Sequence, residues 1–313
     1  MTRAFVFPGQ GSQAVGMGRD LAGAFPAARE TFEEVDEALR QKLSRLMFEG
    51  PEEELVLTEN AQPALMAVSY AVMRVLERDG GLDIKRHVAF VAGHSLGEYS
   101  ALAAAHSFSL ADAARLLKRR GQAMQRAVPV GAGAMAALLG LDLDAAQAVA
   151  REAAQSEVCA VANDNGGGQV VVSGNKTAVE RAVAIAATRG AKRSIMLPVS
   201  APFHCPLMAP AAREMEEALG EVRLGESYVP LVANVTAAAV TDPVEIKRRL
   251  VEQVTGLVRW RESVLYMKQN GVDALIELGA GRVLSGLAKR IDRELAASAI
   301  GAPGEIEAFL KTL

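Results

Sequence analysis

Ser95 is the residue whose surroundings most clearly predict chemistry, because it lies in the pattern Gly93-x-Ser95-x-Gly97. Small residues on both sides of a serine are typical of a nucleophile elbow, a tight turn that holds the hydroxyl at the start of a helix. Ordinary turns also contain this pattern by chance, so the elements on either side of it decide whether it is an elbow. The apolar run at 87–92 predicts a strand, and the alanine-rich run at 98–105 predicts a helix. Since strand, turn and helix are contiguous, we predict that Ser95 is a covalent nucleophile.

A serine hydroxyl is a weak nucleophile until a base accepts its proton, and histidine is the usual base. The chain has four histidines, at positions 87, 94, 106 and 204. His94 is adjacent to the nucleophile, so the turn should aim it elsewhere. His87 and His106 stand at the boundaries of predicted elements, where surface or packing roles are common. His204 lies in a loop bracketed by two prolines, whose restricted backbone can hold an imidazole at a fixed angle, so we predict that His204 is the general base.

A basic side chain follows the nucleophile by one helix. The predicted helix at 110–125 carries Arg120, which could return to the elbow and bind a substrate carboxylate. A guanidinium fork suits a carboxylate better than an ammonium group does. Arg120 fits equally well on a solvated basic face with Lys118 and Arg119, so the residues alone leave both interpretations open.

The elements around these residues indicate an α/β fold with a small inserted domain. Strands and helices alternate along the chain, which predicts a mostly parallel sheet covered on both faces. Between 134 and 197 the order becomes strand, helix, strand, strand, helix, strand, which is the ferredoxin-like βαββαβ order. We predict a discontinuous larger domain at 1–127 and 198–313 and a small domain at 128–197. Other predicted elements are strands at 4–7, 229–234 and 274–278 and helices at 60–79, 208–219 and 244–253.

Composition argues against several other classes of protein. The 313 residues carry a formal net charge of -3, so no overall basic field would draw the chain to nucleic acid or an anionic membrane. No apolar run reaches the length of about 18 residues expected of a membrane span. Two cysteines make no disulfide framework, and nothing near Cys205 predicts the lowered thiol pKa of a cysteine nucleophile. We expect a cytoplasmic monomer that has no metal site and binds neither nucleic acid nor membrane.

An ordered set of motifs resembles the family of malonyl-CoA:acyl carrier protein transacylases, the freestanding acyltransferases of type II fatty acid synthesis. The resemblance spans nearly the whole chain, and the set is far more specific than any one of its members. It implies a hydrolase-like core with an inserted ferredoxin-like domain. The motifs are Phe7-Pro8-Gly9-Gln10-Gly11-Ser12-Gln13, Gln62-Pro63-Ala64, Gly93-His94-Ser95-Leu96-Gly97-Glu98, Arg120-Gly121, Gln169-Val170-Val171-Val172-Ser173-Gly174, Ala201-Pro202-Phe203-His204 and Glu277-Leu278-Gly279-Ala280-Gly281.

The resemblance also implies roles for residues that the chain's own pattern leaves open. Ser95 is acylated and His204 is its base, while the side chain or the backbone carbonyl of Gln253 orients the imidazole. The backbone N–H groups of Gln10 and Leu96 form the oxyanion hole. The flanking glycines at 9 and 11 would let that backbone approach a thioester carbonyl closely.

In the acyl pocket, the resemblance implies that Arg120 binds the free carboxylate of a malonyl group. Met124, one turn further along the same helical face, could line the pocket. Phe203 would leave little room for a methyl branch on the acyl group. An acetyl group would leave the guanidinium without its partner, so we expect selectivity for a dicarboxylic acyl group.

The expected reaction is a ping-pong transfer. Ser95 takes malonyl from malonyl-CoA and gives it to the phosphopantetheine thiol of acyl carrier protein. We expect no cofactor, since the coenzyme A thioester is a substrate and the carrier supplies the phosphopantetheine arm. Carrier proteins of this family are acidic, which predicts a basic patch near the site, although the basic residues concerned fit ordinary solvated surface as well. They are Arg119, Lys192, Arg193, Arg259 and Arg261.

Three other functions compete with this hypothesis. A thioesterase has the same elbow and differs only in which nucleophile collects the acyl group, but it normally carries a Ser-His-Asp arrangement with a late histidine. A dinucleotide-binding protein would use Gly9-x-Gly11 after a strand, yet no acidic residue ends a second strand about 20 positions further on. A carrier-protein binder without catalysis would not need a serine, a base and an arginine together.

Overall fold

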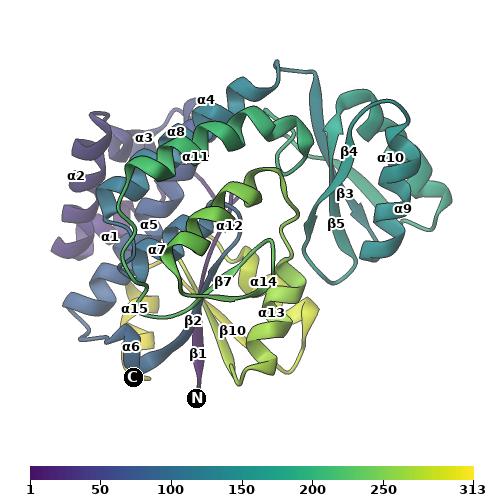
Figure 1. The fold of residues 1–313 in the computed structure, drawn as a ribbon. Helices are drawn as coiled ribbons and strands as arrows, with labels where there is room; N and C mark the ends of the chain where they lie inside the picture. The colour runs from purple at the N-terminus through teal and green to yellow at the C-terminus, as the bar shows by residue number, and fades with distance from the viewer.

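The computed structural model describes residues 1–313, and its strands form two separate sheets. The larger sheet has the order β10-β9-β1-β2-β7-β8, in which all neighbours are parallel except β7 and β8. Figure 1 shows it at the centre of the larger lobe, with helices on both sides. Its strands are β1 (Arg3–Phe7), β2 (Val88–Gly93), β7 (Leu231–Ala233), β8 (Ala238–Val240), β9 (Ala274–Leu278) and β10 (Ala296–Ile300).

The helices of this lobe are α1 (Arg19–Ala24), α2 (Pro26–Leu39), α3 (Leu43–Glu49), α4 (Glu52–Leu55), α5 (Thr58–Arg78), α6 (Ile84–His87), α7 (Gly97–Ala104), α8 (Leu110–Ala127), α11 (Ala209–Glu221), α12 (Pro243–Thr255), α13 (Trp260–Gln269), α14 (Val283–Ile291) and α15 (Pro303–Leu310). Alternation along β1 explains why they cover both faces of the sheet. Phe5 and Phe7 enter a core shared with α5, α7 and α8. Ala4 and Val6 enter a second core shared with α13 and α14.

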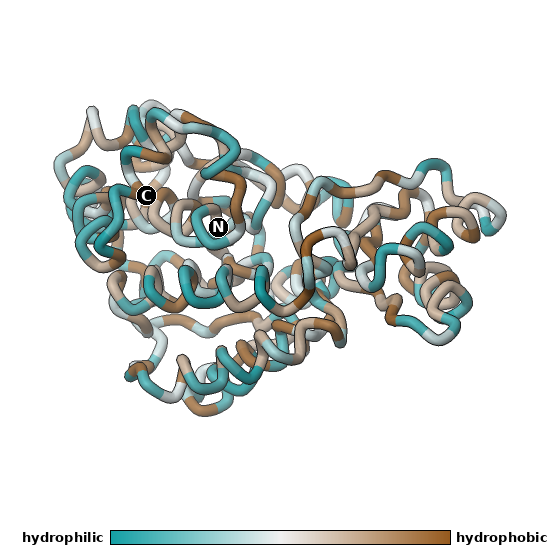
Figure 2. Tube along the Cα trace, turned by 90° about the horizontal axis from the view of Figure 1, so that it is seen from above, coloured by the Kyte–Doolittle hydropathy of each residue, from teal (hydrophilic) through white to brown (hydrophobic).

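The smaller lobe is an antiparallel sheet of the order β4-β5-β3-β6 with two helices on one face. Ala136 and Leu138 of β3 pack against those helices, whereas Met135 and Ala137 belong to the core of the larger lobe. Figure 2 shows this lobe projecting from one side of the molecule. Its elements are β3 (Gly133–Leu139), α9 (Leu143–Ala154), β4 (Cys159–Asp164), β5 (Gln169–Asn175), α10 (Lys176–Thr188) and β6 (Arg193–Met196). The predicted fold class, an α/β core with a ferredoxin-like insertion, is confirmed.

Every predicted strand and helix is present, and each end lies within two residues of its predicted position. The sequence pattern does not predict α1, α3, α4, α6, α13 to α15, β8 or β10. Several of these helices begin at residues whose side chains make no capping hydrogen bond, so the usual start signal is missing; the capping positions are Gly18, Lys42, Arg259 and Arg282. None of the helices combines the length and the apolar character needed to cross a bilayer.

Candidate active site

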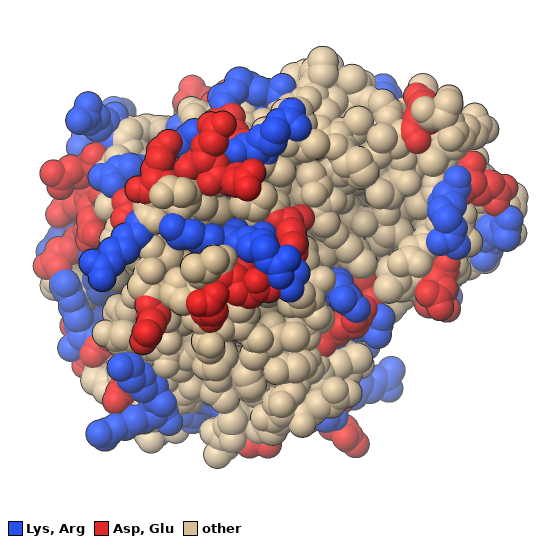
Figure 3. Space-filling model, in the orientation of Figure 1, with Lys and Arg blue, Asp and Glu red and all other residues tan.

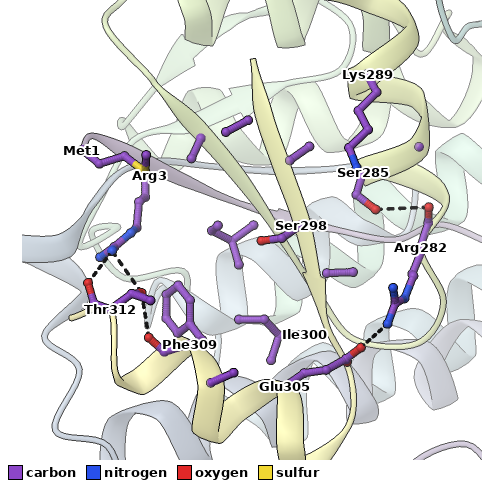
Figure 4. A pocket seen from close by; sticks show the side chains of 17 residues that line it. Met1, Arg3, Arg282, Ser285, Lys289, Ser298, Ile300, Glu305, Phe309 and Thr312 are labelled. Carbon is purple, nitrogen blue, oxygen red and sulfur yellow. Dashed lines mark hydrogen bonds and ion pairs between the residues drawn. The ribbon is translucent and has the colours of Figure 1, made fainter. Parts of the chain in front are cut away.

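The chain has several hollows, and a large one beside β10 contains none of the predicted site residues. It measures about 830 Å³ and follows the open edge of β10 between α14 and α15 (Figure 4). Two of its cations are already held, since Arg3 donates to the carbonyl oxygen of Thr312 at 2.7 Å and Arg282 pairs with Glu305. No histidine lines this hollow, and its one carboxylate, Glu305, is paired with Arg282.

The second hollow measures about 360 Å³ and lies where the two lobes meet. Seven of the eight predicted site residues line it, together with Met135 and Asn163 from the smaller lobe. The seven are Gln10, Ser95, Leu96, Arg120, Met124, Phe203 and His204. The eighth, Gln253, is completely buried. The fold therefore brings together residues that are up to 194 positions apart between Gln10 and His204.

Ser95 sits on a tight turn between β2 and α7, and its backbone has a φ of 55°, which is unusual for a residue with a side chain. Only glycine fits on either side of this turn. A Cβ on Gly93 would lie 1.8 Å from the backbone of Gly97, and one on Gly97 would lie 2.3 Å from the carbonyl oxygen of Phe7. The amide of Ser95 donates to Oδ1 of Asn234 at 2.9 Å. These contacts fix the turn and aim the hydroxyl into the hollow.

His204 lies within hydrogen-bond distance of the nucleophile, with its Nε2 2.8 Å from Oγ of Ser95. Its Nδ1 lies 2.8 Å from the backbone carbonyl oxygen of Gln253. A carbonyl oxygen can only accept, so Nδ1 carries the hydrogen and Nε2 presents a lone pair to the serine. Burial, together with the charge of Arg120, lowers the pKa of His204 to about 3. The imidazole is therefore neutral at physiological pH, as a base must be.

Two backbone N–H groups face the hollow beside Ser95. The amides of Gln10 and Leu96 donate to no acceptor of the protein, although both residues line the hollow. Ser95 cannot supply such a donor, because its own amide is bonded to Asn234. The loop that carries Gln10 approaches the elbow closely, since a Cβ on Gly9 would lie 2.8 Å from the carbonyl oxygen of His94. Paired free amides of this kind can stabilise an oxyanion.

Arg120 is 1% exposed and has no carboxylate partner. Its Nη1 donates to Oε1 of Gln62 at 2.7 Å, and its Nη2 donates to Oε1 of Gln253 at 2.8 Å and to Oγ of Ser95 at 3.1 Å. All three acceptors are neutral, and Nε has no acceptor at all. A buried cation without an anion is costly. The guanidinium therefore suits an anionic group attached to Ser95 and does not lie on a solvated basic face.

The remaining predicted site residues are Met124, Phe203 and Gln253. Met124 and Phe203 are buried and line the hollow. For Gln253, the resemblance allows either the side chain or the carbonyl as the group that orients the imidazole. The carbonyl contacts His204, while the side chain donates to the carbonyl oxygen of Ser95 at 2.9 Å.

Three polar residues of the site have no role predicted from the sequence. Gln62 and Asn234 contact Arg120 and Ser95, and Glu98 contacts Gln253. The sequence contains a signal for Gln62, because an amide on the apolar face of a helix indicates a buried hydrogen-bond partner. Glu98 in the first turn of α7 resembles an ordinary favourable helix charge, so its burial is not foreseeable.

The loop after β1 does not have the geometry of a dinucleotide-binding site, so the hypothesis of a dinucleotide-binding protein is wrong. A dinucleotide site needs a helix that opens directly at the glycines, so that its N-terminus can face the pyrophosphate. Here the chain runs on from Phe7 without a helix until α1 begins at Arg19. The glycine loop instead lies against the elbow through Gly9.

The predicted basic patch is smaller than expected. Figure 3 shows acidic and basic side chains mixed on the face that carries α8, α11 and α12. Arg119 pairs with glutamates of α11, Arg259 with Glu262, and Arg261 with Asp164. Only Lys192 and Arg193 remain exposed without a carboxylate partner, at the start of the strand that leads to Leu197 in the lining of the hollow.

An elbow serine, a neutral histidine and two free amides in one hollow define a serine-dependent acyl-transfer enzyme. A model of the acyl transferase domain matches residues 4–294, so the chain belongs to the acyl transferase family. Among curated relatives, the malonyl CoA-acyl carrier protein transacylase of Bacillus subtilis is 46% identical over 311 residues, covering 99% of this chain and 96% of that protein. The family that the motifs predicted is thereby confirmed.

Solved structures of malonyl-transferring enzymes are also similar to this chain. The acyl-carrier-protein-S-malonyltransferase of Bartonella henselae superposes with a TM-score of 0.98 at 56% identity, over 100% of this chain and 99% of that chain. A malonyl-transacylase solved in complex with a type II PKS acyl-carrier protein superposes with a TM-score of 0.96 at 43% identity, over 100% of both chains.

Proposed function

We propose that this enzyme transfers malonyl from malonyl-CoA to the phosphopantetheine thiol of acyl carrier protein through an ester on Ser95. One observation carries the proposal. A buried arginine without an anionic partner lies 3.1 Å from a serine hydroxyl whose base lies 2.8 Å away. An acyl group on that oxygen with a carboxylate at its far end would supply the missing anion.

In the first half-reaction, Nε2 of His204 accepts the hydroxyl proton while Oγ of Ser95 attacks the thioester carbonyl. The carbon–sulfur bond then breaks, and the departing coenzyme A sulfur takes the proton from the imidazole. The carbonyl of Gln253 steadies the imidazolium that forms in between, through the N–H on Nδ1. The amides of Gln10 and Leu96 stabilise the oxyanion, and each such donor typically contributes about 2.7 to 4 kcal/mol.

In the second half-reaction, the same groups act in reverse order. His204 takes the proton of the carrier thiol, the sulfur attacks the ester carbonyl, and the proton returns to Oγ of Ser95 as the new thioester leaves. No further cofactor is needed for either half, because proton transfer and oxyanion stabilisation are the only tasks. The relative solved with an acyl-carrier protein supports this choice of acceptor.

We also propose a cytoplasmic monomer. All groups of the proposed mechanism come from one chain, and the free thiols of Cys159 and Cys205 suit a reducing compartment.

The proposed function differs from that of a thioesterase in the group that collects the acyl chain. The test incubates the enzyme with malonyl-CoA and holo acyl carrier protein, and measures malonyl-carrier and free malonate in the same sample. We expect malonyl-carrier to be the main product, and we expect neither product from Ser95→Ala. Free malonate as the main product in the presence of carrier would favour the thioesterase.

A further inference from the structure

Glu98 is a buried acidic residue for which the mechanism above has no use. It is 1% exposed and forms no ion pair, although the charge of Arg120 acts on it. Its Oε1 accepts from the amide of Asn234 at 2.6 Å, and its Oε2 accepts from Nε2 of Gln253. Burial raises the pKa of Glu98 to about 8 against these two donors and Arg120, which favour the ionised form, so keeping a carboxylate here is costly. A group retained at such a cost requires an explanation.

Its partner Gln253 connects the two functional groups of the site. The carbonyl of Gln253 holds His204, and its side-chain Oε1 accepts from Nη2 of Arg120. The contact with Arg120 requires that the amide nitrogen of Gln253 point away from Arg120, because a guanidinium only donates and would oppose another donor. Glu98 and the carbonyl oxygen of Ser95 lie on the side to which that nitrogen points, and both accept from it.

We propose that Glu98 is a positioning residue that fixes the side-chain orientation of Gln253, so that Oε1 of Gln253 holds Arg120 beside the oxygen of Ser95. Glu98 itself touches no substrate. This inference rests on the proposed malonyl transfer and adds that malonyl selectivity depends on a carboxyl group behind the site.

Replacing Glu98 by glutamine tests this positioning role with the smallest change in side-chain shape. Glu98→Gln keeps the size of the side chain, but an amide nitrogen stands where an acceptor is required, so either Asn234 or Gln253 loses its partner. Glu277 offers a matched control, because it is also buried and its two oxygens also accept from two N–H groups, here the backbone amides of Leu284 and Ser285. It lies outside the lining of the hollow. Glu277→Gln therefore measures the general cost of removing a buried carboxyl acceptor.

The experiment measures kcat and KM for malonyl and acetyl transfer in wild type and both variants, with the unfolding midpoint of each. We expect Glu98→Gln to lower kcat for malonyl about 10- to 100-fold, the loss typical when a partner that orients a functional side chain is removed. The ratio of malonyl to acetyl kcat/KM should fall as well. Glu277→Gln should lower the unfolding midpoint but keep both kcat and the ratio.

A double-mutant cycle tests the route through Gln253. In a Gln253→Ala background, Glu98→Gln should reduce kcat little further. Fully additive losses would overturn the proposal, as would a Glu98→Gln enzyme that keeps wild-type kcat and selectivity. Should Glu98→Gln not fold, Glu98→Asp shortens the reach but keeps the carboxyl group, and wild-type selectivity in that variant would equally overturn it. Absence of malonyl transfer in the wild type would instead contradict the proposed function.

Discussion

At the scale of single residues, both groups that react lie on unusual backbone. Ser95 and His204 have φ values of 55° and 57°, a region that typically costs a residue with a side chain about 1 to 3 kcal/mol. Their side chains meet at 2.8 Å. The surrounding contacts keep both residues in this conformation; for Ser95, Asn234 accepts from its amide and donates to the carbonyl oxygen of Gly93.

The neutral state of His204 can be measured directly. Because its folded pKa of about 3 lies below the usual value, the ring should stay neutral from pH 5 to 8. Its unfolded form gains a proton as the pH falls below about 6.5, so this group lowers stability only on the acid side. Proton NMR of the ring signals, assigned with His204→Ala, should show no titration in that range.

The NMR experiment contains its own control. His106 pairs with Glu77 at 2.7 Å on the surface, and this hydrogen bond raises the pKa of His106. Its ring should titrate visibly, with a midpoint above the usual histidine value. A His204 midpoint near 6.5 would contradict the account of the base.

Arg120→Ala should separate malonyl from acetyl transfer. Removing the cation leaves the substrate carboxylate unpaired in a buried site, a loss on the order of 3 to 5 kcal/mol, which corresponds to roughly 10²- to 10³-fold or more in kcat/KM. Acetyl transfer makes no use of the guanidinium and should change far less. Arg126→Ala is the control, because Arg126 is an exposed residue of the same helix that pairs with Glu214. Equal losses for both substrates would remove Arg120 from the acyl pocket.

The local sequence pattern is enough to locate Ser95 and His204. It cannot identify Glu98 or decide between the two groups of Gln253, because their contacts join positions 155 apart in the chain. Hydrogen bonds between residues far apart in the chain produce no recognisable spacing in the sequence, so the roles that depend on them cannot be predicted from it.

At the scale of elements, the elbow depends on the close approach of the end of β1 to the start of α7. Gly97→Ala would force a Cβ to within 2.3 Å of the carbonyl oxygen of Phe7. The loop with Gln10 would then move away from the amide of Leu96. We expect kcat to fall about 10²- to 10³-fold, as when an oxyanion donor is lost.

Gly220→Ala is the matched glycine control. Gly220 lies in α11 with nothing near its missing Cβ, so alanine should leave kcat unchanged and raise the free energy of unfolding by about 0.5 to 1 kcal/mol. Wild-type kcat in Gly97→Ala would show that the close approach is unimportant.

Elements are predictable where an apolar run has clear turn signals at its end, as for β9, whose ends match the predicted 274–278. The strand β10 is not predictable, since its sequence Ala-Ala-Ser-Ala-Ile has small side chains and little alternation of apolar and polar residues. Its position at the sheet edge follows only from pairing with β9.

At the scale of the whole molecule, the site lies between two lobes, and the smaller lobe contributes Met135 and Asn163 to the hollow. Lys192 and Arg193 are exposed and unpaired in the same lobe, at the opposite end of β6 from Leu197 in the lining. We expect Lys192→Glu with Arg193→Glu to raise KM for the carrier roughly tenfold and to weaken its salt dependence. Formation of the acyl-enzyme from malonyl-CoA should not change. A double replacement of the exposed Lys289 and Lys311 by Glu controls for net charge, and an equal effect there would contradict a local docking patch.

The central claim is that Ser95 holds the malonyl group between donor and acceptor. Intact-protein mass spectrometry after brief exposure to malonyl-CoA, without carrier, tests it most directly, with peptide mapping to find the modified residue. We expect one added malonyl group on Ser95, its disappearance on addition of holo acyl carrier protein, and no adduct on Ser95→Ala. An adduct on another residue, or malonyl transfer by Ser95→Ala at the wild-type rate, would contradict it.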